Sequence, residues 1–391
     1  MKVKVKVKAW NDESGQMIAL LAVCIVVLLG FVALAADVGV MFHEKRMAQS
    51  AADAAAIAGA EQIQFGDVIP AAQTDAARNG FTDGVDGATV AVYNPPNDGP
   101  NVGKSAYVEV IVSKLQPTYF MRLFGVNSMT LSARAVAALE PSNICQLGNE
   151  GIKYAGSADI QSPGCTAQSN GDFQIAGSAT VNMAGEYSVG PYTTDGNPVI
   201  AVPPSSDALP VPDPLAYLQP PSYSGCQSAA NSNPLSPGCY NNLTITGPVS
   251  LNPGLYIING NLNLTGQGSL TGTGVTFYIT PKGSISVTGQ ATMNLSAPTS
   301  GTYDGILFYQ DPSNTTSANF TGGDGTILQG ILYFPNALVN WVGGSTLSQT
   351  PSDPLAMSII AGQIEFSGNS TIENYSELNP TSPLLSPRIV E

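Results

Sequence analysis

The acidic residues of the C-terminal half are the first candidates for chemistry, because two converging carboxylates can hydrolyse a glycosidic bond. The candidates lie far apart, and no spacing pairs them: Asp304, Asp311, Asp324 and Glu365. The single histidine, His43, lies in a charged stretch near the N-terminus, so the C-terminal half has no histidine for a Ser–His–Asp triad. We therefore predict no catalytic residues and a protein that is not an enzyme.

Metal and cofactor sites are equally poorly supported by the sequence. A lyase acting on polysaccharides needs a basic residue and acidic clusters for Ca²⁺, and only Lys153, Lys282 and Arg388 are available as bases. The segment Gly322–Gly325, GGDG, resembles a Ca²⁺-binding repeat but occurs once, which is a weak signal. No phosphate-binding loop or zinc-ligand spacing is present, so we predict no cofactor and no metal.

The charge of the chain argues against nucleic acid as a partner. The 391 residues contain 14 Lys and Arg against 28 Asp and Glu, for a net charge of −14. Only Lys282 and Arg388 are basic beyond residue 153. An acidic surface repels phosphates, so no nucleic acid is expected to bind.

The cysteines predict an oxidising environment. Cys24 lies in an apolar segment, and the other four are candidates for two disulfides: Cys145, Cys165, Cys226 and Cys239. Pairing Cys145 with Cys165 and Cys226 with Cys239 is the simplest of three connectivities. Four free buried thiols are the alternative.

Residues 17–36 form an uncharged apolar segment long enough for a helix to cross a bilayer. The preceding tail, residues 1–16, carries four lysines, and Asp37 follows the segment. The positive-inside rule therefore places the N-terminus in the cytoplasm and the rest of the chain outside. A cleaved signal peptide is the alternative, because Ala33–Ala35 reads ALA. Pilin-type cleavage after Gly15 is disfavoured, because Leu20 replaces the glutamate that it requires.

The apolar segment passes into an alanine-rich stretch, residues 37–66, that predicts a long helical stalk. Small residues recur on one face of this helix at spacings of three and four: Ala48, Ala52, Ala55 and Gly59. Such a face allows another backbone to approach closely. The face packs either on a partner helix or on a domain of the same chain, and the sequence leaves both open.

Five positions carry a resemblance to a known family. They combine an apolar span with an Asp-Val-Gly exit and a Gln-Ser-Ala-Ala-Asp segment: Gly15, Asp37, Gly39, Gln49 and Asp53. This pattern resembles the N-terminal domain of the TadG-like family of Flp (tight adherence) pilus-assembly proteins. The metal-binding Asp-x-Ser-x-Ser motif of some relatives is absent. The region from Cys145 onward resembles the glycine-rich repetitive C-terminal regions of other members.

The resemblance implies a single-pass protein of the bacterial inner membrane, with its C-terminal domains periplasmic or extracellular. Its partners would be other pilus-assembly proteins, reached through the stalk, with a glycan or another surface ligand as a further partner. Asp37, Gln49 and Asp53 are the residues expected to act in stalk assembly.

Residues 67–140 predict a small α+β domain. Residues 70–79 favour a short helix, because proline begins it and Gly80 follows it. Alternating apolar residues predict strands at 88–93, 106–113 and 129–139, with another helical turn at 118–124. The domain is expected to be a platform between the stalk and the C-terminal region.

A six-residue glycine-led pattern recurs seven times in the C-terminal region, residues 141–391. It starts at Gly156, Gly177, Gly266, Gly289, Gly323, Gly343 and Gly368, and four of the six intervals lie between 20 and 25 residues. Such a period without a helix signal predicts a parallel β-helix, or solenoid, of eight or nine coils. An antiparallel sandwich is the alternative. The expected core includes Leu262, Leu264, Leu270, Val275, Phe277, Ile279, Ile285, Val287, Met293 and Leu295.

A proline-rich insert at about residues 198–239 interrupts the repeats. We expect a loop that leaves the solenoid and returns near Tyr240, with the Cys226–Cys239 disulfide at its base. It is either a binding loop that offers Tyr217, Tyr223 and Tyr240, or a cover over an exposed edge.

The sequence thus predicts a mainly β protein with a transmembrane helix, a helical stalk, a small α+β domain and a β-solenoid. Its expected role is non-enzymatic support of Flp pilus assembly or surface adhesion. The alternative function is a membrane-tethered solenoid that binds or cleaves carbohydrate, and a surface-layer or exopolysaccharide-associated protein is a third.

Overall fold

The computed structural model describes residues 14–141, 143–208, 210–228, 233–344, 346–348, 357–374 and 385–391. Most of the expected cytoplasmic tail, residues 1–13, lies outside them. The chain divides into two compact units. The first comprises the residues up to Glu140 together with Pro387–Glu391, and the second comprises Pro141–Ser386.

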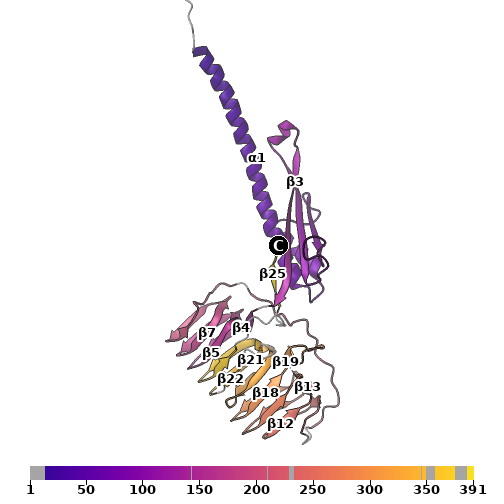
Figure 1. Cartoon of the computed structure of the whole chain (residues 1–391), viewed down its shortest axis with the longest axis vertical. Helices are drawn as coiled ribbons and strands as arrows, with labels where there is room; N and C mark the ends of the chain where they lie inside the picture. Colours follow the sequence, from indigo (N-terminus) through magenta and orange to yellow (C-terminus); the bar gives the residue numbers. More distant parts are fainter. Residues whose placement is uncertain are drawn as a thin grey trace, which may run out of the picture. The chain divides into compact units, whose positions relative to one another are not determined.

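The first unit contains one long helix, one short helix and a four-stranded sheet (Figure 1). Its elements are α1 (Ser14–Glu61), α2 (Val68–Arg78), β1 (Ala88–Tyr93), β2 (Tyr107–Pro117), the 3-10 helix η1 (Met121–Phe124), β3 (Ser128–Pro141) and β25 (Leu385–Ile389). The apolar segment and the stalk are one uninterrupted helix of 48 residues. The expected helices and strands of the α+β domain are present.

The sheet has the strand order β1-β2-β3-β25, and β2 pairs antiparallel with both β1 and β3. Alanines of α1 and α2 pack on valines and alanines of the sheet and form one core. The last five residues were expected in the solenoid, but they lie in this unit. The reason is main-chain pairing, because Val136 of β3 exchanges backbone hydrogen bonds with Val390 and Glu391.

The second unit is a parallel β-solenoid of about nine turns. Its strands are β4 (Ile144–Tyr154), β5 (Asp159–Ser169), β6 (Asp172–Gly177), β7 (Thr180–Ser188), β8 (Tyr192–Gly196), β9 (Val199–Ile200), β10 (Gly238–Tyr240), β11 (Leu243–Ile245), β12 (Pro248–Leu251), β13 (Gly254–Ile258), β14 (Asn261–Leu264), β15 (Ser269–Gly272), β16 (Val275–Ile279), β17 (Ser284–Thr288), β18 (Thr292–Ser296), β19 (Ile306–Gln310), β20 (Ala318–Thr321), β21 (Ile327–Val342), β22 (Thr346–Ser348), β23 (Met357–Ser367) and β24 (Thr371–Glu373). The described pairings are parallel, which confirms the solenoid over the sandwich.

Stacking places the buried apolar side chain of each coil above the equivalent side chain of the neighbouring coil. All ten expected core residues between Leu262 and Leu295 are at most 2% exposed. One column is strongly aromatic: Phe320 stacks on Trp341 with ring centroids 4.2 Å apart, and Phe366 follows at 6.0 Å. Such columns hold the coils together by burial of apolar area and by ring stacking.

The coils do not stack in simple chain order. The strands run β10 to β24 and then β4 to β9, so the last coil, residues 357–373, lies on the first, residues 144–162 (Figure 1). Ile359 of β23 pairs with Gln146 of β4, and Phe366 pairs with Tyr154. Two ends of the unit that are distant in sequence therefore meet in the middle of the stack.

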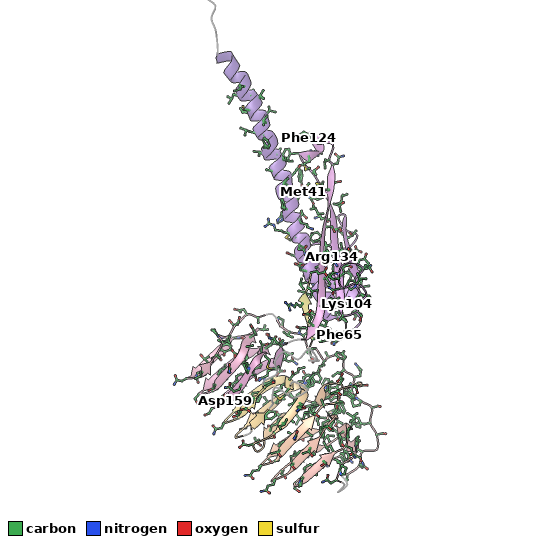
Figure 2. The ribbon with its side chains drawn as sticks, viewed as in Figure 1. Met41, Phe65, Lys104, Phe124, Arg134 and Asp159 are labelled. Atoms are coloured by element: carbon green, nitrogen blue, oxygen red, sulfur yellow. A yellow bond between two sulfur atoms is a disulfide. The ribbon has the colours of Figure 1, made fainter. Side chains whose placement is uncertain are left out.

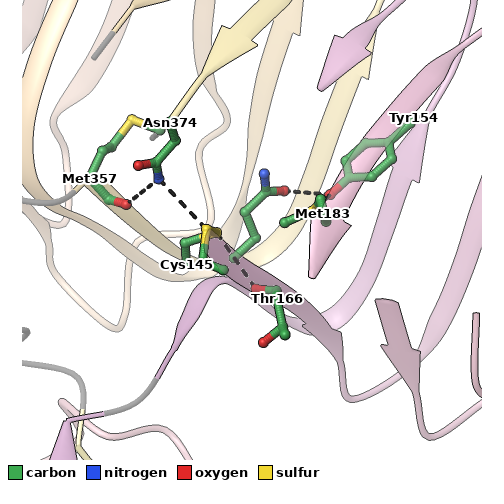
Figure 3. Close-up of a disulfide and its surroundings, with 8 residues drawn as sticks. Cys145, Tyr154, Thr166, Met183, Met357 and Asn374 are labelled. Atoms are coloured by element: carbon green, nitrogen blue, oxygen red, sulfur yellow. Dashed lines mark hydrogen bonds between the residues drawn. A yellow bond between two sulfur atoms is a disulfide. The ribbon is translucent and has the colours of Figure 1, made fainter. Parts of the chain in front are cut away.

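The two disulfides follow the simplest predicted pairing, Cys145–Cys165 and Cys226–Cys239. Figure 3 shows the first of them near the place where the last coil meets the first. There Asn374 donates a hydrogen bond to the backbone oxygen of Met357 at 2.9 Å. This disulfide links strands β4 and β5 of neighbouring coils beside that junction.

Candidate functional site

Asp37 of α1 is the most specifically bound of the predicted stalk residues. Its carboxylate accepts the backbone N–H groups of Tyr119 at 3.0 Å, Phe120 at 2.8 Å and Met121 at 2.6 Å. The side chain is only 2% exposed. Hydrogen bonds from main-chain donors to a carboxylate are strong, so Asp37 fixes the tip of the β2–β3 hairpin, residues 118–127, on the helix.

Gln49 and Asp53 also bind within the chain. Gln49 Nε2 donates to Asp53 Oδ1 at 2.8 Å and to the backbone oxygen of Arg134 at 3.1 Å. A turn earlier, Glu44 forms a 3.1 Å ion pair with Lys114 of β2. Asp37 and Gln49 thus bind the hairpin directly, whereas Asp53 binds Gln49 within the helix.

The small-residue face of α1 is covered by the molecule's own sheet and helix. Ala48, Ala52 and Ala55 are at most 1% exposed. A Cβ added at Gly59 would lie 3.0 Å from Val108 Cγ1. The sequence left open whether this face packs on a partner helix or on a domain of the same chain, and the structure shows the second.

The two glycines of the motif are placed differently. Gly15 lies at the start of α1. Gly39 lies on the exposed side of the helix, and no heavy atom falls within 4 Å of a Cβ built on it. The structure joins Gln49 to Asp53 and binds Asp37 and Gln49 to the hairpin, and it brings neither glycine into these contacts.

An ion cluster around Arg134 was not anticipated. Arg134 of β3 binds Glu109, whose side chain is fully buried, and Glu391. The hydrogen bonds that Arg134 donates, first to Glu391 and then to Glu109, raise the pKa of Arg134 above its usual value. These residues are distant in sequence and share no pattern, so no signal in the sequence marks them.

The acidic candidates of the solenoid have separate surroundings. Asp311 accepts hydrogen bonds from Tyr278 and Ser313, and Glu365 forms a 3.0 Å ion pair with Lys153. Asp304 is exposed. Among the described residues, no three His, Cys, Asp or Glu side chains are grouped as metal ligands.

The described residues of the proline-rich segment follow the solenoid between the two ends of the coil stack. We call these residues, 201–208, 210–228 and 233–237, the strap. Its Val211 exchanges hydrogen bonds with Asn170, Asp213 accepts one from Tyr333, and Leu218 O accepts one from Tyr309. Leu215 and Leu218 pack into an apolar cluster on the outer side of strands β16, β19 and β21.

The expectation that this segment leaves the solenoid is wrong for its described residues, because its leucines and main chain bind along the coils. Tyr240 belongs to the core and is 2% exposed, so it offers no contact surface. Tyr217 and Tyr223 remain 36% and 40% exposed. The Cys226–Cys239 disulfide joins the end of the strap to β10.

A shallow groove lies on one side of the coil stack, with a volume of about 210 Å³. Glu150, Lys153, Asp172, Gln174 and Glu365 are among its lining residues. The outward positions of neighbouring strands continue as a polar ladder of Asn263, Ser286, Asn319, Asn340, Glu365, Lys153, Gln174 and Thr193. The ladder offers uncharged hydrogen-bonding groups with one ion pair, and Glu150 and Asp172 add two further carboxylates to the groove.

Glu186 of β7 is a buried carboxyl group inside the solenoid. It is 1% exposed, and its two oxygens have no hydrogen-bond partner in the described part of the chain. Burial raises its pKa to about 7. The neighbouring hydroxyls of Tyr154 and Tyr192 have raised pKa values, first from burial and then from the charge of Glu186.

α1 is long and apolar enough to cross a membrane. Only 6% of its most apolar window, within Leu20–Glu61, is buried inside the molecule. The fold and site thus define a class of protein in which one helix has an exposed apolar half and a second half packed on a small sheet. The solenoid is inserted in the chain between β3 and β25, two strands of that sheet.

Comparison with known families agrees with this description. Residues 15–62 match the family described as "Putative Flp pilus-assembly TadE/G-like", and residues 46–137 match "Putative Tad-like Flp pilus-assembly". These matches support a TadG-like family, as the resemblance implied, and they support a role in pilus assembly. Comparison with curated proteins and with solved structures gives no significant match.

Proposed function

We propose that this protein is a non-enzymatic, membrane-anchored envelope protein that supports assembly of a Flp pilus or adhesion through it. α1 crosses the bacterial inner membrane once, with its N-terminus in the cytoplasm and with the sheet of the first unit and the solenoid outside. The observation that carries the proposal is the exposed apolar half of α1, which continues directly into the helix matched by both families. Lipid is the environment in which so long an exposed apolar surface is stable.

The face of α1 left free by its own sheet is the surface for other assembly proteins. Met47 is 44% exposed, although the neighbouring Ala48 is buried. A photo-crosslinker at Met47 in native cells is expected to capture other pilus-assembly proteins. One at Val85, an exposed apolar residue outside the helix, is the matched control.

Two results would count against this role. If the crosslinker at Met47 captures only lipid and other copies of this chain, the free face of α1 is not a surface for other assembly proteins. Normal numbers of pili, counted by electron microscopy after deletion of the gene, would remove the assembly role altogether.

The polar ladder favours a second candidate, a solenoid that binds carbohydrate. Amide and hydroxyl groups repeat along it at the spacing between strands, which suits the hydroxyls of an extended glycan. Glycan-array binding that is lost in Asn340→Leu would support it. If no glycan on the array binds, the carbohydrate-binding function is contradicted and pilus assembly remains as the proposed function.

A further inference from the structure

The tip of the β2–β3 hairpin exposes an unusual amount of apolar surface. Six apolar residues in and beside it are at least 37% exposed: Tyr119, Phe120, Leu123, Phe124, Val126 and Met129. Leu123 and Phe124 reach 79% and 85%. Exposed apolar patches of this kind mark interaction sites in folded proteins.

The tip is an ordered structure with its own internal bonds. The Thr118 hydroxyl donates to Val126 O, and Thr118 N donates to Asn127 O at 3.0 Å. Gly125 ends η1 in the left-handed region at φ +88°. A folded turn that still presents leucine and phenylalanine outward offers these side chains for contact rather than burying them.

The position of the tip along α1 indicates what it contacts. Asp37, which binds the tip, is the first residue after the apolar segment 17–36. Figure 2 labels Phe124 on the tip and Met41 on the helix that the hairpin reaches. Twenty helical residues span about 30 Å, the hydrocarbon thickness of a bilayer, so the tip lies level with the adjoining lipid headgroups.

The composition of the tip fits this depth. Tyrosine is enriched at membrane–water interfaces, and leucine and phenylalanine insert at the boundary between headgroups and acyl chains. Arg122 is exposed and lies close enough to Asp37 to interact with its charge. A guanidinium at this level also suits lipid phosphates.

We propose that the hairpin tip is a second membrane contact, with Phe120, Leu123 and Phe124 inserted into the lipid interface beside α1. The inference rests on the proposed crossing of the membrane by α1. Two contacts on one rigid unit fix how that unit tilts and rotates above the bilayer, which a single helix does not do.

The test uses the full-length protein in vesicles of phosphatidylethanolamine and phosphatidylglycerol. Single cysteines in a Cys24→Ser background carry an environment-sensitive fluorophore at Leu123, at Val26 in the apolar segment, or at Val102. Val102 is 54% exposed in the β1–β2 loop, at the opposite end of the sheet from the tip, and serves as the matched control. All three side chains are exposed, so labelling leaves the fold intact.

The label at Leu123 is expected to shift its emission to shorter wavelength. It should also lose at least about half its intensity to a quencher attached near the lipid headgroups, whereas the Val102 label does neither. A Leu123 label that behaves like Val102 while Val26 is quenched by lipid would overturn the membrane contact and leave the anchor intact. A Val26 label that lipid does not quench would overturn the anchor itself. A shift at Leu123 without lipid quenching would assign the tip to a protein partner or a second copy, against the proposal.

Discussion

At the scale of single residues, Asp37 shows how one carboxylate can position a distant element. It lies 82 to 84 positions from the three residues whose amides it accepts, so the sequence could identify Asp37 but not its partners. Backbone amides have no side-chain signature. The predicted role of Asp37 in stalk assembly thus remains a proposal, alongside its observed hydrogen bonds within the unit.

Asp37→Asn is expected to loosen the hairpin tip without unfolding the sheet. The neutral amide retains one oxygen and loses the charge that strengthens all three hydrogen bonds, a loss of about 1–3 kcal/mol. Hydrogen exchange at Tyr119, Phe120 and Met121 should accelerate roughly ten- to hundredfold. Glu44→Gln, which removes a partly exposed ion pair, is the control, and equal protection in both variants would contradict the assignment.

Glu186 predicts a pH dependence of the solenoid. Its carboxyl titrates near its ordinary value of 4.5 in the unfolded chain and near 7 when buried. Because the folded-state pKa is raised, its stabilising contribution is complete below about pH 4.5 and is lost as the pH rises through about 7. Tyr154 and Tyr192 stay neutral across this range, because their pKa values are raised from 10.

Glu186→Gln should therefore remove part of the loss of stability between pH 5 and pH 8. The buried Trp341 reports urea unfolding of the solenoid by its fluorescence. The midpoint of the parent protein should fall more steeply with pH than that of the variant. Parallel pH profiles would mean that Glu186 ionises as freely in the fold as in the unfolded chain.

At the scale of elements, the helix and the coils differ in how far the sequence predicts them. Alanine content and the absence of proline predicted α1 and its small-residue face, but not whether that face packs inward or on a partner. The answer depends on the sheet, where Val108 lies so close to α1 that a Cβ at Gly59 would be 3.0 Å from its Cγ1, and where the buried alanines of the face join the same core.

Ala52→Leu tests that close approach. Ala52 is fully buried, and overpacking at such a position costs about 1–3 kcal/mol. Ser50→Leu adds the same side chain at an exposed position of the same helix and should change stability by less than about 0.5 kcal/mol. Thermal unfolding in detergent micelles measures both. Equal effects would indicate that the face is free rather than covered.

The repeats predicted the solenoid and its core, because each coil buries the same position of the pattern. They could not predict the order of the coils. Periodicity is a local property, whereas contact between the first and last coils depends on how two distant edges fit. The strap follows from this order, since the chain must travel from β9 at one end of the stack to β10 at the other.

At the scale of the whole chain, the order of the coils explains how a solenoid is inserted into a small sheet. The chain leaves that sheet at β3 and returns to it at β25. Such an insertion is simplest when the first and last coils of the inserted unit are neighbours. In an ordinary solenoid they lie at opposite ends, but here β23 pairs with β4.

Two glycines test this junction directly. Gly156 of the first coil has φ +69°, and a Cβ on it would lie 2.9 Å from the backbone nitrogen of Gly368 in the last coil. Gly343 has a similar φ of +88°, yet a Cβ there would meet nothing within 4 Å. Gly343→Ala should therefore cost only the backbone strain of about 1–2 kcal/mol. Gly156→Ala should cost about 1–3 kcal/mol more, because the backbones of the two coils must separate.

Urea unfolding followed by Trp341 fluorescence measures the difference between the two variants. A clearly lower midpoint for Gly156→Ala is the expected result, because both substitutions impose the same type of strain and only one meets a neighbouring backbone. Equal midpoints would mean that the first and last coils are not in contact. The solenoid would then stack in chain order, and the strap would have no distance to cover.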